Sequence, residues 1–270
     1  MKNIFKKIVV YFLTLEARAF LARFKPTVIA VTGTVGKTSA KDAIAAALAP
    51  FAFVRKSEKS YNSDIGVPLA ILGEKNQWNN PFGWLKILIL SIYYLLSTKY
   101  YPRFLVLEVG TDMPGDIRAI VKWLKPHVVV VTKLSRAPVH VENFASVGEL
   151  IAEKGALVSG LRNGGALIVN ADDTDVLAFR ALAPRGAKII SFGFRDGVDV
   201  RADEFGSLLE VHGTLGTPPL YAALAGLSVA KALEFDLARA ARALSKRVLA
   251  PGRMRLLYGI NGARIIDDTY

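Results

Sequence analysis

The chain contains no cysteine in its 270 residues, which excludes disulfide bonds and thiolate metal sites and is compatible with a reducing cytoplasm. The chain also has fewer acidic than basic residues, with 23 Asp and Glu against 35 Lys and Arg, which gives a net charge of +12. This positive excess favours anionic partners, such as nucleotide phosphates, nucleic acid or an acidic membrane surface. Hydrophobic residues make up 52% of the chain, so a disordered protein is excluded.

The chain also lacks an uncharged apolar run of the roughly 20 residues that a membrane-spanning helix needs. Residues 6–24 are apolar but are interrupted by Glu16, Arg18 and Arg23, and residues 81–101 contain Lys86. Neither segment is followed by the small-residue cleavage site of a signal peptide. We expect two amphipathic helices that pack on the domain or on a partner. Shallow binding at an anionic membrane surface is the alternative.

Short, continuously apolar runs alternate with helix-like stretches along the rest of the chain. This alternation predicts an α/β domain with a mostly parallel sheet that is covered on both faces. Ligands of such folds gather at the carboxyl ends of the strands, and the informative polar residues of this chain follow those ends. The expected strands are residues 27–33, 104–110, 127–134, 165–172 and 187–194.

One strand-to-helix junction, "VTGTVGKTSAKDAI" (31–44), has the composition of a phosphate-binding loop. Glycine lets the backbone approach a phosphate closely, and the helix that follows offers unpaired N–H groups. Lys37 can reach the outer phosphates, and the Thr38 hydroxyl can hold Mg²⁺. In the common loop pattern the first glycine would fall at Val31, whereas here it is Gly33. The segment predicts an ATP site; the alternative is an ordinary turn with an incidental lysine.

The shifted glycine and five further segments resemble the Mur ligases. The loop "TGTVGKTS" is similar to the family's TG(T/S)xGKT(T/S), and the other segments follow in the family's order: "SYNSDIGVPLAIL", "LEVGTDMPGDI", "VVVVTKLSRAPVHVENFAS", "LIVNADD" and "GRMRLL…RIIDDTY". The resemblance runs from about residue 26 to residue 270. It implies an α/β P-loop ATPase domain of Mur ligase type, which an amphipathic helix precedes.

The resemblance also implies a reaction and its substrates. The best-matching member type forms an amide from a UDP-linked muramoyl tripeptide and D-alanyl-D-alanine, with ATP and an acyl-phosphate intermediate, in the cytoplasm or at the inner face of the membrane. Two alternatives stay open. One is another ligase of the superfamily, of the folylpolyglutamate, cyanophycin or lipid-linked amidotransferase type, and the other is a non-catalytic nucleotide-binding protein on a membrane surface. Nucleic acid is not expected, because the chain has no basic–aromatic platform.

Three residues would carry the metal chemistry. Glu108 ends a buried strand, where an isolated carboxylate needs a cation; the resemblance implies Mg²⁺, and a salt bridge to an arginine is the alternative. His140, by itself typical of a surface loop, is implied to bind a second Mg²⁺. Lys154, by itself typical of an exposed helical lysine, matches a family lysine that CO₂ carbamylates. Asn170 is expected near the nucleotide, although a local Asn–Asp turn explains it nearly as well.

The complete set of predicted site residues follows from the motifs. The catalytic residues are Lys37, Glu108, His140 and Lys154. The ATP-binding residues are Thr34, Gly36, Lys37, Thr38, Ser39, Asn170, Arg253 and Asp268. The metal ligands are Thr38, Glu108, His140 and carbamylated Lys154, and the substrate-binding residues are Asn62, Ser63 and Asp64.

The expected organisation has three parts. They are a helical segment at residues 1–24, an ATP-binding domain at 25–252 with an apolar helical insertion at 81–101, and the start of a last domain at 253–270. The first, UDP-binding domain of a full Mur ligase has no room before the loop, so the chain resembles a fragment. If the chain has no continuation, we expect at most weak ATP binding and no complete amide synthesis.

Overall fold

A computed structural model describes residues 2–58, 61–134, 141–205, 216–246 and 255–269. Its main sheet has seven strands in the order β2-β3-β1-β4-β5-β6-β7, and every pairing in it is parallel. The predicted α/β fold with a mostly parallel sheet is confirmed. The strands are β1 (Thr27–Thr32), β2 (Val54–Lys56), β3 (Phe104–Glu108), β4 (Val128–Val131), β5 (Ala166–Asn170), β6 (Lys188–Gly193) and β7 (Val200–Arg201).

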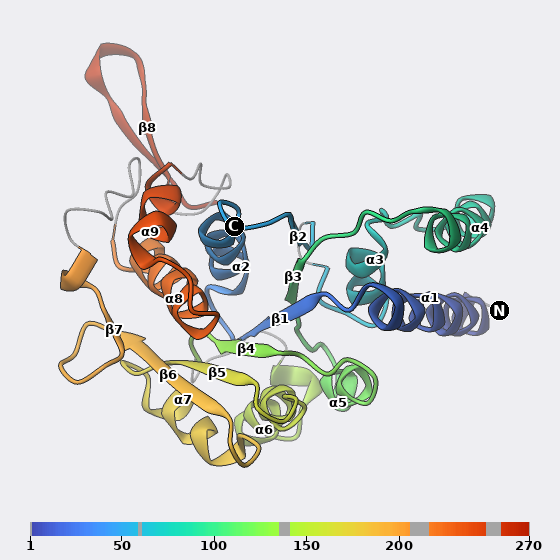
Figure 1. The fold of residues 1–270 in the computed structure, drawn as a ribbon, viewed down its shortest axis with the longest axis horizontal. Coiled ribbons are helices and arrows are strands. Elements are labelled where there is room, and N and C mark those ends of the chain that lie inside the picture. Colours follow the sequence, from blue (N-terminus) through green and yellow to red (C-terminus); the bar gives the residue numbers. More distant parts are fainter. Residues whose placement is uncertain (1, 59–60, 135–140, 206–215, 247–254, 270) are drawn as a thin grey trace.

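Helices cover both faces of this sheet (Figure 1). Successive side chains of a strand point to opposite faces, and β1 accordingly sends Val28 and Ala30 into one apolar core and Ile29 and Val31 into the other. The first core is completed by α1 (Lys2–Phe24), α3 (Gly66–Leu72), α4 (Pro81–Ser97), α5 (Asp116–Val121), α6 (Val147–Ser159) and α7 (Thr174–Ala178). The second core is completed by α2 (Lys37–Leu48), α8 (Pro218–Ala232) and α9 (Leu237–Ser245).

A separate antiparallel hairpin follows the domain. It consists of β8 (Arg255–Tyr258) and β9 (Arg264–Asp267), joined by the 3₁₀ helix Ile260–Gly262, and it extends away from the main sheet (Figure 1). Three more 3₁₀ helices occur among the described residues, at Val141–Asn143, Phe179–Leu182 and Asp203–Phe205. The domain boundaries drawn at residues 24, 252 and 253 stay a prediction.

The two apolar segments of the sequence form a pair of neighbouring helices, α1 and α4 (Figure 1). The Ser91 hydroxyl of α4 donates to the Glu16 carboxylate of α1, and the rings of Phe20 and Tyr94 stack at 6.1 Å. Burial raises the pKa of Glu16, although its hydrogen bond to Ser91 acts in the opposite direction. In the part of the chain that the structure describes, no helix is both long and apolar enough to cross a bilayer.

Candidate nucleotide-binding site

The loop between β1 and α2 adopts a conformation that needs its two glycines. Gly33 has φ +143° and Gly36 has φ +84°, both in the region that favours glycine. A Cβ at Gly33 would lie 2.2 Å from Thr132 Oγ1, so only glycine fits there. The loop backbone therefore stays open in front of the first turn of α2, and the N–H groups at the start of a helix can meet an anion.

Contacts with the end of β4 hold this loop in place. Thr34 N donates to the Lys133 carbonyl at 2.6 Å, and Thr132 Oγ1 donates to the Val35 carbonyl at 2.7 Å. Lys37 Nζ donates to the Thr34 carbonyl at 3.2 Å, so the lysine folds back over the loop. Phosphate oxygens could take the place of this carbonyl.

A hydroxyl and a carboxylate meet behind the loop. Thr38 Oγ1 of α2 donates to Glu108 Oε2 at the end of β3, at 2.8 Å. Lys41 Nζ lies 3.8 Å from the same oxygen, and both of these charged side chains are almost fully buried. The cation beside Glu108 in the structure is thus a lysine of α2, and the magnesium ion expected at this carboxylate stays a prediction. The Glu108 N–H donates to Ser57 Oγ at 3.2 Å, which fixes the strand end.

These residues fit ATP and one Mg²⁺. Hydroxyl and carboxylate oxygens are the hard ligands that Mg²⁺ prefers, usually with several waters retained. In the described ranges, no cluster of three His, Cys, Asp or Glu side chains could hold a metal by itself. His140 lies outside the described residues, so the second metal site stays a prediction.

Lys154 of α6 is buried, with only 5% of its surface exposed, so the alternative of an exposed helical lysine is wrong. Burial and, second to it, the charge of Lys37 lower its pKa to about 8, although Asp112 and Glu153 oppose the shift. The interaction with Lys37 brings α6 into the electrostatic environment of the loop. A lysine with this pKa carries a substantial neutral fraction near neutral pH.

The predicted substrate loop abuts the same strand end. The Asn62 carbonyl accepts from Gly110 N at 3.0 Å, and a Cβ at Gly110 would lie 2.8 Å from Asn62 Nδ2. Gly110 comes two residues after Glu108, so Asn62 lies near the strand end that carries the Glu108 carboxylate.

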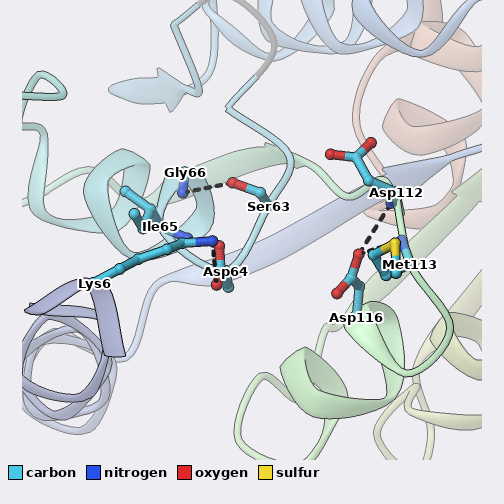
Figure 2. A network of polar contacts seen from close by, with 8 residues as sticks. All are labelled: Lys6, Ser63, Asp64, Ile65, Gly66, Asp112, Met113 and Asp116. Carbon is cyan, nitrogen blue, oxygen red and sulfur yellow. Dashed lines mark hydrogen bonds and ion pairs between the residues drawn. The ribbon is translucent and has the colours of Figure 1, made fainter. Parts of the chain in front are cut away.

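Figure 2 shows how this substrate loop is fixed. Asp64 accepts from Ile65 N at 2.9 Å and pairs with Lys6 of α1 at 3.2 Å, and Ser63 Oγ accepts from Gly66 N at 3.4 Å. In a second group of contacts in the same view, the Asp116 carboxylate accepts from the N–H groups of residues 112 and 113, at 3.0 and 2.8 Å.

The remaining predicted nucleotide-binding residues are Asn170, Arg253 and Asp268. Asn170 Oδ1 accepts from Asp172 N at 3.0 Å, as in the local turn that was the alternative explanation. Asp268 is exposed beyond β9. Arg253 lies outside the described residues.

Three residues at the site were not anticipated from the sequence: Ser57, Lys41 and Thr132. Lys41 had a signal, because it follows Thr38 by three residues and therefore shares its helix face. Thr132 and Ser57 follow strand ends, but only the strand order shows which loop or carboxylate each of them supports.

A parallel α/β sheet with a glycine loop at the end of β1 and a Thr–carboxylate pair behind it is the arrangement typical of P-loop nucleotide-binding proteins. Residues 89–216 match the family model of the Mur ligase middle domain. The UDP-N-acetylmuramoyl-tripeptide–D-alanyl-D-alanine ligase of Escherichia coli (strain K12) is 27% identical over 261 residues, which cover 90% of this chain and 51% of that protein. The Bacillus subtilis (strain 168) protein of the same name is 25% identical, over 94% of this chain and 52% of its own.

Solved structures agree on the fold. MurF from Acinetobacter baumannii superposes with a TM-score of 0.74 at 23% identity, over 97% of this chain and 55% of that one. MurF from Thermotoga maritima in complex with ADP gives 0.72 at 24% identity, over 97% and 57%. The match of residues 89–216 to the Mur ligase middle domain confirms the resemblance drawn from the six motifs. It spans about half the length of the curated relatives that it matches.

Proposed function

We propose that the chain provides the ATP-binding and carboxylate-activating site of a ligase of peptidoglycan precursor synthesis. The curated relatives are named as ligases of UDP-N-acetylmuramoyl tripeptide and D-alanyl-D-alanine, and we assign the same substrate pair. The observation that carries the proposal is the 2.8 Å contact between the Thr38 hydroxyl and the Glu108 carboxylate, behind the glycine loop.

The chemistry assigned to this site has two steps. The γ-phosphoryl group of ATP moves to the substrate carboxylate, so the bond to ADP breaks and an acyl phosphate forms. The amine then attacks the acyl carbon, loses a proton and expels phosphate as the amide forms. Lys37 offsets negative charge on the moving phosphoryl group, because its ammonium already lies over the loop.

Metal ions and the carbamate belong to the same proposal. Thr38 and Glu108 would hold Mg²⁺, which neutralises phosphate charge when it is bound. His140 and carbamylated Lys154 would hold a second ion. The lowered pKa of Lys154 supports the carbamate, because only the neutral amine attacks CO₂.

The acceptor would bind along residues 62–64. Asn62 lies against Gly110, and Ser63 and Asp64 bond their own loop backbone, so this loop reaches the strand end that carries Glu108.

Nucleotide binding is the direct test. Isothermal titration of the 270-residue chain should show Mg²⁺-dependent ATP binding that Lys37→Ala and Thr38→Ala abolish. Lys122→Ala, which removes an exposed lysine remote from the loop, is the matched control and should leave binding intact. Equal affinity in the wild type and Lys37→Ala would contradict the site.

The first half-reaction separates a ligase from a protein that only binds nucleotides. ADP formation should rise when the muramoyl tripeptide is present, because its carboxylate accepts the phosphoryl group. A tripeptide without that carboxylate should have no effect. An identical rate with both peptides would contradict the ligase proposal, and a response to a folate or cyanophycin acceptor instead would favour another branch of the superfamily.

Contact with the inner face of a membrane is a separate proposal, since the nucleotide site does not require it. The exposed apolar side chains of α1 and α4 support this contact.

A further inference from the structure

Helix α4 is apolar around almost its whole circumference but is buried along only one side. Trp84, Ile87 and Ser91 face the core, at a helical spacing of three and four residues. A helix that is hydrophobic all round is normally enclosed by protein or lipid. The exposed large apolar side chains on α4 are Phe82, Leu85, Ile89, Leu90, Ile92, Tyr93, Tyr94 and Leu96, of which Phe82 is 82% and Tyr93 68% exposed.

Helix α1 repeats this pattern. Its inner side carries Val9, Leu13, Ala17 and Phe20, all of which lie in the core. Its outer side is also apolar, although it faces solvent. The exposed side chains are Ile4, Phe5, Ile8, Tyr11, Phe12 and Leu15, and four of them recur at intervals of four, three and four residues. They form a continuous stripe along the helix.

The two helices cannot cover each other's exposed sides. Their mutual contact uses Glu16 with Ser91 and Phe20 with Tyr94, which lie on the inner side or at its edge. The outer apolar side chains therefore remain exposed on both helices. A contiguous apolar surface of this extent marks an interaction site in a soluble domain.

Charge indicates the partner. Glu16 is the only acidic residue in α1 and α4, and it is buried and hydrogen-bonded. The exposed charges on these helices are all positive, and Lys7, Arg18 and Lys86 flank the apolar stripes. We propose that the outer faces of α1 and α4 dock in the plane of a bilayer that contains anionic lipids. A cationic rim around apolar and aromatic side chains matches phosphate headgroups above hydrocarbon.

The dimensions of α4 agree with in-plane docking. Its 17 residues span about 25 Å, less than the roughly 30 Å hydrocarbon core, so it lies on the membrane instead of crossing it. Trp78 before the helix and Tyr100 after it are 79% and 85% exposed. Tryptophan and tyrosine are the side chains that favour the membrane–water interface.

The docking surface reaches the substrate loop. A cavity of about 740 Å³ lies between the start of α1 and the start of α4, and its lining includes Phe5, Trp78, Trp84 and Ile65. Lys6 pairs with Asp64 beside this cavity (Figure 2). Docking would thus bring residues 62–65 close to the membrane surface. The docking itself does not depend on the ligase reaction.

Vesicle flotation of the 270-residue chain tests the proposal. The chain should float with phosphatidylcholine vesicles that contain phosphatidylglycerol and much less with pure phosphatidylcholine, and 0.5 M NaCl should weaken the binding. Replacing Lys7 and Lys86 by Gln should reduce partitioning about fivefold for each cation. Trp78 fluorescence should shift to the blue on binding, and Trp78→Phe should remove the shift.

A matched pair of apolar variants separates docking from general stickiness. Phe82→Ser with Ile89→Ser should abolish flotation, whereas Ile260→Ser, which is 87% exposed on the distant hairpin, should leave it unchanged. All these side chains are exposed, so each variant should fold, and circular dichroism checks this. Equal flotation of both variants would overturn the proposal. A chain that dimerises through α1 and α4 and stays off vesicles would also overturn it, and would assign the surface to a second copy.

Discussion

Lys154 gives the sharpest chemical prediction. A shift of its pKa from 10.5 to about 8 raises the neutral fraction of the amine about 300-fold at pH 7, to roughly one amine in ten. The neutral amine can attack CO₂, which forms an N–C bond and releases one proton from nitrogen to solvent. An ordinary surface lysine at this pH stays almost entirely protonated and reacts far less.

Bicarbonate enriched in ¹³C is added to the folded chain, and ¹³C NMR spectra are recorded between pH 7 and 9. We expect a carbamate signal that grows through a midpoint near pH 8 and is absent in Lys154→Ala. Lys122→Ala, the exposed-lysine control, should keep the signal. Lys37→Met should weaken it at pH 7, because removal of the neighbouring positive charge raises the pKa of Lys154 and leaves a carbamate anion without its cation.

Two results would refute this reasoning. One is the absence of a carbamate signal in the wild type at pH 8 under saturating bicarbonate. The other is a signal of equal size in Lys154→Ala, which would mean that a different amine reacts.

Three further predictions concern stability and the loop. Lys41→Met should lower the free energy of unfolding by about 3 kcal/mol in urea titrations, because the buried Glu108 carboxylate loses its cation. Lys56→Met, which breaks an exposed ion pair, is the control and should lower it by under about 1 kcal/mol. Equal losses in the two variants would contradict the buried pair. Gly33→Ala should abolish ATP binding in calorimetry, whereas Gly115→Ala, also at positive φ but with nothing within 4 Å of the new Cβ, should keep it. Burial and, second to it, the charge of Arg162 lower the pKa of His127 from 6.5 to about 4, so His127 stays neutral in the folded chain near neutral pH. The free energy of unfolding should therefore fall as the pH drops from 6.5 towards 4, because the unfolded chain binds the proton more readily. An unchanged urea midpoint between pH 7 and 5 would contradict this.

The sequence predicted those parts of the site that are local in the chain. The glycine loop and Thr38 lie within six residues, and Glu108 ends an unbroken apolar run, so a pattern could reveal them. Lys41 was missed as the partner of Glu108, because their contact requires β3 to lie beside β1, and this order is a property of the sheet.

The helical spacing of apolar residues around Lys154 indicates its burial, although a motif comparison overlooks this spacing. In α6 the buried side chains include Leu150, Lys154, Leu157 and Val158, at the spacing of one helix face. The lysine therefore belongs to the apolar stripe, and its burial follows from periodicity alone.

Short or uniform elements gave no pattern to recognise. β2 and β7 contain three and two residues, too few for an alternation. α3 is buried at all seven positions, so it has no polar face that would mark its period. The pairing of Glu16 with Ser91 joins residues 75 apart, and it depends on the packing of α1 beside α4 (Figure 1).

A structure of the chain with Mg²⁺ and a non-hydrolysable ATP analogue tests the central claim most directly. The account predicts the triphosphate against residues 33–38, with Lys37 Nζ moved from the Thr34 carbonyl to a phosphate oxygen. It also predicts a magnesium ion about 2.1 Å from Thr38 Oγ1, on the side that faces Glu108. An analogue bound elsewhere, or a metal that contacts neither Thr38 nor Glu108, would contradict it.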